Sequence, residues 1–296
     1  MHFFPKTLNL IGVCLILATL ALFPESPRAQ MGPEHFKPLK ERILADPDIN
    51  VSPEVISAIF SDSRIFFETK GISSYFRHRE STLNYDQFMS DPSISNALRY
   101  METHKDALSR AEKKYNVDRE IITAILLVET RLGTFTGRQK AINILSTMAA
   151  LTNPEIRDAF YSHIPEEGRI SRERYDSRAD ARGEWAYREL KALITYTNRD
   201  NFDIFEIESS YAGAVGFAQF MPSNILILGV DANNTGRVNL FEHDDAIFSI
   251  ANYLRHHGWR TGLDREEEKK VLLHYNRSTY YANILMEISD RLKEDS

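Results

Sequence analysis

The 296-residue chain is long enough to bury a substantial hydrophobic core, as one large domain or two modest ones. Its 43% hydrophobic and 26% charged residues are ordinary for a soluble globular protein. The net charge of −6 offers no electrostatic basis for a nucleic-acid partner, and the single cysteine excludes an internal disulfide framework.

Residues 1–30 have the pattern of an export signal. Lys6 gives a positive start, residues 8–23 are almost wholly apolar, and the small residue Ala29 lies near a possible cleavage point. Cleavage there would place Pro27 at the third position upstream, which is unfavourable, so an uncleaved N-terminal anchor is the alternative. We therefore expect an exported protein of the periplasm or cell envelope, tethered to the membrane if the segment is retained. The only cysteine, Cys14, lies inside this segment.

Helical periodicity runs through most of the remaining chain, and strand signals are few. Helices are predicted at 53–60 with Ser52 as N-cap, from Asp91 through to 115, at 185–196, at 245–254 and at 280–292. The charged segment 164–183 is interpreted as a solvated surface loop or insertion. The sequence thus predicts a mostly α protein, with a helical N-terminal extension at 31–90 and a main domain at 91–296.

Residues 118–137, DREIITAILLVETRLGTFTG, contain the first functional signal. An unbroken apolar run at 121–128 predicts a helix buried on most sides, and it ends at Glu129. A carboxyl group at the edge of a core is desolvated, which raises its pKa and lets it donate a proton to a leaving oxygen, as glycosidases require. The alternative is a structural ion pair between Glu129 and Arg131.

Residues 208–223, ESSYAGAVGFAQFMPS, contain the second signal. Small residues between 209 and 216 allow a backbone to approach a ligand closely. Gln219 supplies an amide, and Tyr211, Phe217 and Phe220 supply flat apolar faces. A sugar ring has polar edges and C–H faces, so a carbohydrate site needs both kinds of group. Tight helix packing is the alternative explanation for the small residues.

Together, VETRLGTFTG and SYAGAVGFAQFMPS resemble the membrane-bound lytic murein transglycosylase B family, which has a lysozyme-like fold. The pattern continues in order with HGW at 257–259 and YNRSTYY at 275–281, so the resemblance covers roughly residues 96–281. The chain departs from the pattern at Ser209, where glycine is usual, and at His274, where a small residue is common.

The resemblance implies a role for each matching residue. Glu129 corresponds to the catalytic acid and base of the family. The positions expected to contact the glycan are Ser210, Gln219, Met221, Tyr275, Asn276 and Tyr281, of which Met221 and Tyr281 are equally compatible with core packing. The implied partners are peptidoglycan glycan strands, with possible association with cell-envelope machinery or the membrane, and we expect a monomer that binds no nucleic acid.

The implied reaction is a lyase-type cleavage in which a single glutamate acts first as acid and then as base, leaving 1,6-anhydromuramic acid ends without consuming water. No cofactor is implied for the chemistry. A lysozyme-like hydrolase of the goose type would use the same glutamate with water as nucleophile. It needs a base, and Asp203, Glu206 and Glu208 are sequence candidates for a second carboxylate. A non-catalytic glycan-binding scaffold is the third possibility, which an intact Glu129 disfavours.

Residues 231–242, DANNTGRVNLFE, fit the template of an EF-hand calcium loop. The ligand positions 1, 3, 5, 7, 9 and 12 fall on Asp231, Asn233, Thr235, the backbone carbonyl of Arg237, Asn239 and Glu242. Threonine at position 5 is a departure, and two carboxylates imply weak binding. Members of the resembling family can carry a calcium loop here; the alternative is a metal-free surface turn. His243, His256 and His257 show no zinc-ligand spacing and are interpreted as structural or surface residues.

Overall fold

The structure is a computed structural model that describes residues 31–69, 72, 85–164 and 169–295. The predicted export segment 1–30 lies outside the described residues. The elements are η1 (Pro33–Phe36), α1 (Lys37–Leu44), α2 (Pro53–Ile59), η3 (Asp86–Met89), α4 (Asp91–Thr103), α5 (Lys105–Tyr115), α6 (Arg119–Thr130), β1 (Gln139–Lys140), α7 (Ala141–Ala150), α8 (Pro154–His163), α9 (Arg172–Arg199), β2 (Glu208–Ser209), α10 (Pro222–Leu228), α11 (His243–His256), α12 (Arg265–Tyr275) and α13 (Thr279–Asp295). The predicted mostly α fold is confirmed.

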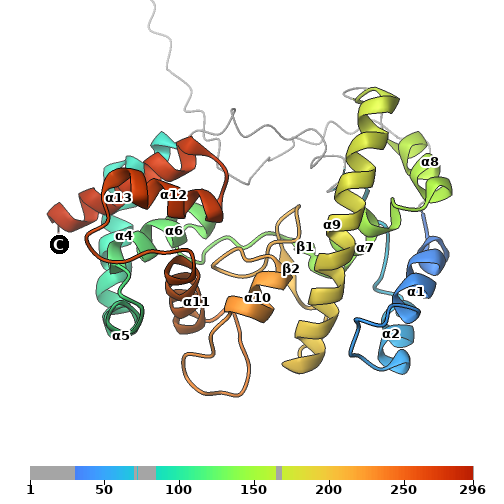
Figure 1. Ribbon diagram of the computed structural model, residues 1–296, viewed down its shortest axis with the longest axis horizontal. Coiled ribbons are helices and arrows are strands. Elements are labelled where there is room, and N and C mark those ends of the chain that lie inside the picture. Colours follow the sequence, from blue (N-terminus) through green and yellow to red (C-terminus); the bar gives the residue numbers. More distant parts are fainter. Residues whose placement is uncertain (1–30, 70–71, 73–84, 165–168, 296) are drawn as a thin grey trace, which may run out of the picture.

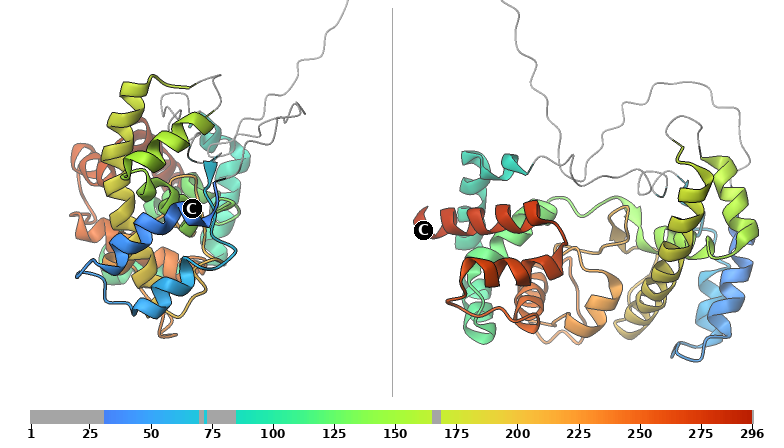
Figure 2. Two further views of the ribbon diagram at one scale, coloured as in Figure 1. Left: turned by 90° about the vertical axis from the view of Figure 1, so that its right-hand side faces the viewer. Right: turned by 45° about the horizontal axis from the view of Figure 1, so that its top comes forward.

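The described helices form two groups (Figure 1). One contains α4, α5, α6, α11, α12 and α13, and the other contains α1, α2, α7, α8 and α9. The short antiparallel pair β1–β2 and helix α10 lie between them, and α10 contacts both α9 and α11 (Figures 1 and 2). The residues that directly follow the first motif pair with the start of the second motif at this junction: Gln139 pairs with Ser209, and Lys140 pairs with Glu208.

Helix α6 is the central helix of the first group. Its side chains from residue 120 to residue 128 are all buried, because α13, α4, α5 and α11 pack around it. Burial of such a continuous apolar run contributes roughly 1.5–3 kcal/mol for each large aliphatic side chain removed from water. The predicted buried helix is confirmed, and it fixes the position of the residues at its C-terminal end.

Within the second group, the N-terminal elements η1 and α1 pack against α7, and α2 packs against α1. Ser52 caps α2 as predicted, since its side chain accepts a hydrogen bond from the backbone N–H of Val55. The connection after α1 is fixed to α9: the Asp46 carboxylate accepts hydrogen bonds from the Tyr187 hydroxyl at 2.7 Å and the Lys191 ammonium at 2.8 Å. None of the helices within the described ranges is both long and apolar enough to cross a membrane.

Two of the sequence predictions are wrong in part. The single helix predicted from Asp91 to 115 is two helices, α4 and α5, because the backbone leaves helical geometry at His104, whose ring packs against those of Tyr100 and His243. Most of the predicted loop at 164–183 is helical, because α9 already begins at Arg172.

The first turns of α9 bury one narrow face. Tyr175, Ala179 and Gly183 recur at a spacing of four residues, and Ala179 and Gly183 are too small to give a hydrophobic signal in the sequence. Gly183 lies against Thr152, where a Cβ atom would come within 2.7 Å of the threonine methyl carbon. The charged residues occupy the exposed face, so composition alone suggested a loop.

Candidate active site

Glu129 lies in the last turn of α6 and is half-buried. Its Oε1 atom accepts a hydrogen bond of 2.6 Å from the hydroxyl of Tyr281 on α13, and Tyr281 is 2% exposed. Burial, followed by the charge of Glu129, raises the pKa of Tyr281 well above its ordinary value of 10.0, so the phenol keeps its proton and acts as the donor. Tyr281 was expected either to line the glycan groove or to pack in the core; it is buried, and its hydroxyl lies on the predicted catalytic carboxylate.

Tyr275 and Asn276, the YN pair, lie at the end of α12. The Tyr275 hydroxyl donates to the backbone carbonyl of Ala218 at 2.6 Å, and its ring is stacked on that of Tyr281 with centroids 6.4 Å apart. Burial and the nearby Glu129 charge also raise the pKa of Tyr275 well above 10.0. Asn276 ends the helix in extended conformation. The pair is therefore beside Glu129, and Tyr275 joins it to the segment of the second motif.

The chain turns sharply directly after α6. Arg131, Leu132 and Gly133 have φ angles of 50°, 62° and 86°, three consecutive residues in the left-handed region. The turn is closed by hydrogen bonds from the Arg131 and Leu132 N–H groups to the carbonyls of Leu127 and Leu126. Arg131, the alternative ion-pair partner of Glu129 in the sequence, donates to Gln87 at 2.9 Å.

The 210–221 segment folds as a compact series of turns against β2. Ser209 bridges to Val215, and Val215 bridges to Phe220. The Ser210 Oγ atom accepts hydrogen bonds from the N–H groups of Ala212 at 3.4 Å and Ala214 at 3.2 Å. Because the hydroxyl acts as acceptor in these bonds, its proton is available for donation to a ligand oxygen.

The side chain of Gln219 joins this segment to the loop after Glu129. Its amide nitrogen donates to the carbonyls of Gly216 at 2.8 Å and Thr136 at 3.3 Å, and its backbone is left-handed with φ 49°. A strained non-glycine residue is frequent where a site must be held rigid. Gly216 is required by close packing, because a Cβ atom there would lie 2.5 Å from the Leu240 carbonyl oxygen.

Met221 is half-buried and immediately precedes α10. The start of α10 is held by a residue that the sequence did not reveal. Glu189 of α9, 6% exposed, accepts hydrogen bonds from the Ser223 N–H at 3.0 Å and from the Ser223 hydroxyl at 2.9 Å. Tyr85 was missed as well: it is 8% exposed and packs edge-on against Tyr281 with ring centroids 6.3 Å apart. Neither contact has a local sequence signal.

The three carboxylates suggested as a second catalytic group are engaged in ion pairs. Asp203 pairs with Arg64 at 2.7 Å, while Glu206 and Glu208 lie 3.5 Å and 4.0 Å from the Lys140 ammonium. The hydrogen bond from Arg64 lowers the pKa of Asp203 below its ordinary value. The three contacts link β1, β2 and the N-terminal region.

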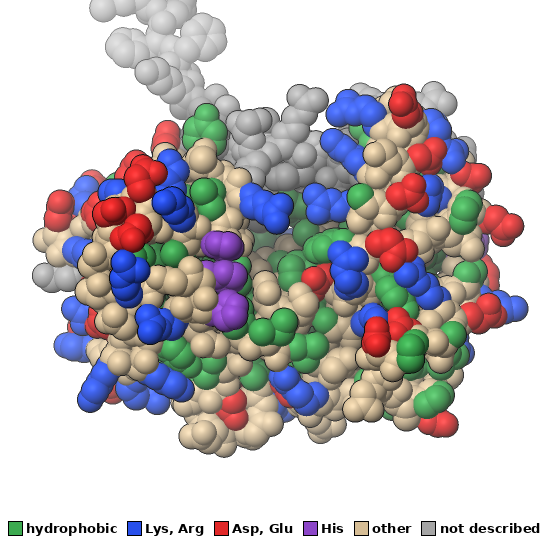
Figure 3. Space-filling model, viewed as in Figure 1, with side chains coloured by type: hydrophobic (Ala, Val, Ile, Leu, Met, Phe, Trp, Pro, Cys, Tyr) green, Lys and Arg blue, Asp and Glu red, His purple; other side chains and the backbone are tan. Residues whose placement is uncertain are grey.

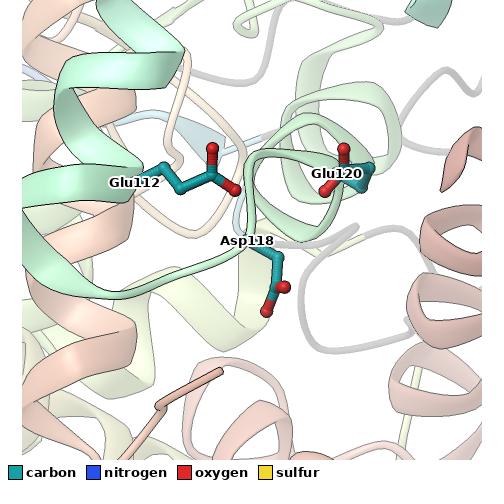
Figure 4. Close-up of side chains that lie close together, drawn as sticks. All are labelled: Glu112, Asp118 and Glu120. Atoms are coloured by element: carbon teal, nitrogen blue, oxygen red, sulfur yellow. The ribbon is translucent and has the colours of Figure 1, made fainter. Parts of the chain in front are cut away.

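A second group of carboxylates lies at the opposite end of α6. Glu112, Asp118 and Glu120 have oxygen atoms within 4.8 Å of one another around the connection from α5 to α6 (Figure 4). Glu120 pairs with Arg119 at 3.0 Å, and Asp118 accepts a hydrogen bond of 3.1 Å from the indole of Trp259 and lies 3.8 Å from the Lys293 ammonium. These contacts satisfy the cluster, which we interpret as structural.

The predicted calcium loop has part of the required geometry. Asp231 accepts hydrogen bonds from the N–H groups of Thr235 at 2.9 Å and Gly236 at 2.7 Å, which closes the loop. The Thr235 hydroxyl lies 3.3 Å from the Asp231 carboxylate and 3.2 Å from the Arg237 carbonyl. Oxygen atoms at positions 1, 5 and 7 therefore converge, and these are hard donors suited to Ca²⁺. Asn239 Oδ1 accepts a hydrogen bond from the Phe241 N–H. The two remaining predicted ligands are Asn233 and Glu242.

One face of the molecule recedes between the two groups of helices, and hydrophobic side chains are exposed there (Figure 3). Histidines form a row at its edge. Among the histidines, the rings of His257 and His274 are stacked with centroids 4.4 Å apart, and His256 packs edge-on against His257 at 4.9 Å. His274 directly precedes Tyr275, so this group of three histidine rings adjoins the YN pair.

The sequence matches the family described as "Transglycosylase SLT domain" over residues 47–268. It is 31% identical over 176 residues to the membrane-bound lytic murein transglycosylase B of Escherichia coli (strain K12). That alignment covers 60% of this chain and 41% of the relative, so the chain spans less than half the length of the curated relative that it matches.

Two solved structures share the fold. SltB3 from Pseudomonas aeruginosa, in complex with NAG-NAM-pentapeptide, gives a TM-score of 0.69 at 17% identity, over 88% of this chain and 80% of that one. The Escherichia coli lytic transglycosylase Slt35, in complex with calcium, gives a TM-score of 0.59 at 20% identity, over 92% of this chain and 99% of that one. At these identities the likeness establishes the fold alone.

Proposed function

Since the chain belongs to the Transglycosylase SLT domain family, we propose that it is a lytic transglycosylase that cleaves the β-1,4 bond between N-acetylmuramic acid and N-acetylglucosamine in peptidoglycan. The observation that carries the proposal is the hydrogen bond of 2.6 Å from the buried Tyr281 hydroxyl to Glu129. The phenol is a neutral donor that orients the Glu129 carboxyl group for proton transfer.

In the proposed reaction, Glu129 first transfers its proton to the bridging oxygen as the bond from C1 of the muramic acid residue to that oxygen breaks. Glu129 is then ionised and accepts the proton of the C6 hydroxyl of the same sugar, whose oxygen forms the new bond to C1. The products are a 1,6-anhydromuramic acid end and a free 4-hydroxyl group, and Glu129 regains its proton. No cofactor takes part.

The substrate is proposed to lie along the 210–221 segment and the YN pair. Ser210 offers a hydroxyl proton, Met221 an apolar face and Asn276 an amide, whereas the Gln219 amide nitrogen and the Tyr275 hydroxyl are already bonded within the protein. We therefore assign Gln219 and Tyr275 both to shaping the groove and to contacting the sugar through their remaining atoms. The relative crystallised with NAG-NAM-pentapeptide is consistent with a glycan strand as substrate.

Mass spectrometry of the muropeptides released from purified sacculi by residues 31–296 tests the proposal. Anhydromuramic acid ends are expected. Reducing ends would instead establish a hydrolase of the goose-type lysozyme kind, and would require a base other than Asp203, Glu206 and Glu208 in their present ion pairs. Binding to sacculi without release of any product would identify a scaffold.

Two further parts of the proposal concern the cell and the metal. Residues 1–30 are proposed to direct export to the periplasm or cell envelope; a cytosolic full-length protein in fractionated cells would contradict this.

The 231–242 loop is proposed to bind one Ca²⁺ weakly in a structural role, through Asp231, Thr235 and the Arg237 carbonyl among others. Calorimetric titration of residues 31–296 with Ca²⁺ is expected to give one site, which Asp231→Asn weakens; no heat of binding up to millimolar Ca²⁺ would exclude it.

A further inference from the structure

We propose that the hydroxyl of Thr130 is a positioning residue, which holds Glu129 at a fixed place relative to the 210–221 segment. This inference rests on the proposed role of Glu129. Thr130 directly follows Glu129 and is 1% exposed. Its Oγ1 atom lies 3.1 Å from the carbonyl oxygen of Phe217, 87 residues away in the sequence, and 3.3 Å from the carbonyl oxygen of Leu126 in its own helix.

The same hydroxyl also fixes the turn after α6. Its oxygen accepts a hydrogen bond of 3.0 Å from the N–H of Gly133, the third of the three consecutive left-handed residues. A threonine hydroxyl has one proton and two lone pairs, so it can donate to Phe217 while accepting from Gly133. Thr130 thus joins three parts of the site: the last turn of α6, the strained turn, and the second motif.

These bonds complete a closed path of contacts around Glu129. The path leads from Thr130 to the Phe217 carbonyl, and the next residue, Ala218, accepts the hydroxyl of Tyr275 at 2.6 Å. Tyr275 stacks on Tyr281, and Tyr281 donates to Glu129 at 2.6 Å. Movement of Glu129 relative to the second motif must break one member of this path. Thr130 reaches the second motif through the backbone carbonyl of Phe217 and is not among the residues proposed to contact the sugar.

Catalysis should be more sensitive to loss of this hydroxyl than binding is. The groups that would contact the glycan lie on the second motif and the YN pair, which keep the Tyr275–Ala218 hydrogen bond when Thr130 is changed. The direction of the Glu129 carboxyl depends on the last turn of α6, and displacements below 1 Å at a reacting group are enough to slow proton transfer. We therefore expect a lower kcat with little change in KM.

The test compares Thr130→Val, which keeps the shape and removes the hydroxyl, with Thr130→Ser, which keeps the hydroxyl. Thr123→Val is the matched control: Thr123 is fully buried in the same helix, and its hydroxyl donates at 2.8 Å to Arg119 four residues earlier. Steady-state cleavage of soluble glycan strands is expected to show kcat reduced about tenfold for Thr130→Val, KM within about twofold, and kcat for Thr130→Ser within about threefold of the unmodified protein.

Several outcomes overturn the inference. They are an unchanged kcat for Thr130→Val, an equal loss for Thr123→Val, or a loss for Thr130→Ser as large as that for Thr130→Val. If Thr130→Val does not fold, Thr130→Ser decides: a kcat reduced tenfold with an unchanged melting temperature contradicts the role of the hydroxyl. An unmodified protein without lytic activity on the same strands would instead overturn the proposed function, which separates the two failures.

Discussion

At the N-terminal end of α6, Glu120 and Asp118 are held by Arg119, Lys293 and the indole of Trp259, whereas at the C-terminal end Glu129 receives the hydroxyl of Tyr281. Ion pairs of this kind tie a carboxylate to its place in the fold. A helix N-terminus also stabilises negative charge, while a C-terminus disfavours it. The same helix therefore has ion-paired structural carboxylates at one end and, at the other, the proposed catalytic carboxyl group beside a phenol donor.

The largest effect should separate Glu129→Gln from Glu120→Gln, the same substitution at the two ends of α6. Loss of the acid and base at Glu129 is expected to reduce muropeptide release about a thousandfold, within the range that general acid catalysis contributes. The rate of muropeptide release by Glu120→Gln is expected to stay within about threefold of the unmodified protein, because the new amide oxygen still accepts a hydrogen bond from Arg119. Release rates from sacculi measure both, and a comparable loss in Glu120→Gln would remove the distinction between the two ends.

The next effect tests whether the neutral donor matters at the catalytic end. Tyr281→Phe removes the hydroxyl but keeps the ring, and we expect a ten- to hundredfold lower rate, of the order of one lost transition-state contact, about 1.4–2.7 kcal/mol. A hydrogen bond to a carboxylate favours its ionised form, so the alkaline limb of the pH–rate profile should move to higher pH. Tyr280→Phe is the control, since Tyr280 is 71% exposed. Identical pH profiles for the two variants would contradict this role of Tyr281.

The smallest effect concerns the structural end and depends on pH. Burial, and then the charges of Glu120 and Asp118, raise the pKa of Glu112 above its ordinary value of 4.5, against a hydrogen bond from the Arg119 N–H. A carboxyl group whose pKa is raised in the folded state destabilises the fold as pH rises above its unfolded-state pKa, and it has no effect where it is protonated in both states.

Glu112→Gln is therefore expected to stabilise the protein at pH 7 by about 0.5 kcal/mol, a small value because Glu112 is only half-buried and screened by water. The gain should vanish near pH 3. Urea unfolding at the two pH values measures it; a gain that is the same at both would show that charge is not the cause.

The sequence was sufficient to predict where Glu129 lies, but not which residues contact it. The apolar run at 121–128 and the carboxylate that ends it were sufficient to place Glu129, because both lie in one helix and follow its period. The hydrogen bond from Tyr281 to Glu129 joins residues 152 positions apart, and the one from Thr130 to Phe217 joins residues 87 positions apart. No local pattern encodes such pairs, and the family resemblance, which left Tyr281 between groove and core, did not pair it with Glu129.

The fold errors have a similar origin. The break at His104 lies where its ring packs against His243 of α11, and the first turns of α9 include Gly183, which fits closely against Thr152. Periodicity reports which side chains are apolar. It does not report which small residues face a neighbouring helix, or where a ring from a distant element forces a helix to end.

Helix α13 has a practical consequence for any shortened form of the protein. The family match ends at residue 268, but α13 packs along α6 and supplies Tyr281, and α12 ends with Tyr275 only after residue 268. A fragment cut to the bounds of the match would keep Glu129 and lose the phenol that donates to it, while exposing the apolar side of α6 to water. Such a fragment would be expected to aggregate, and its inactivity would say nothing about the chemistry of Glu129.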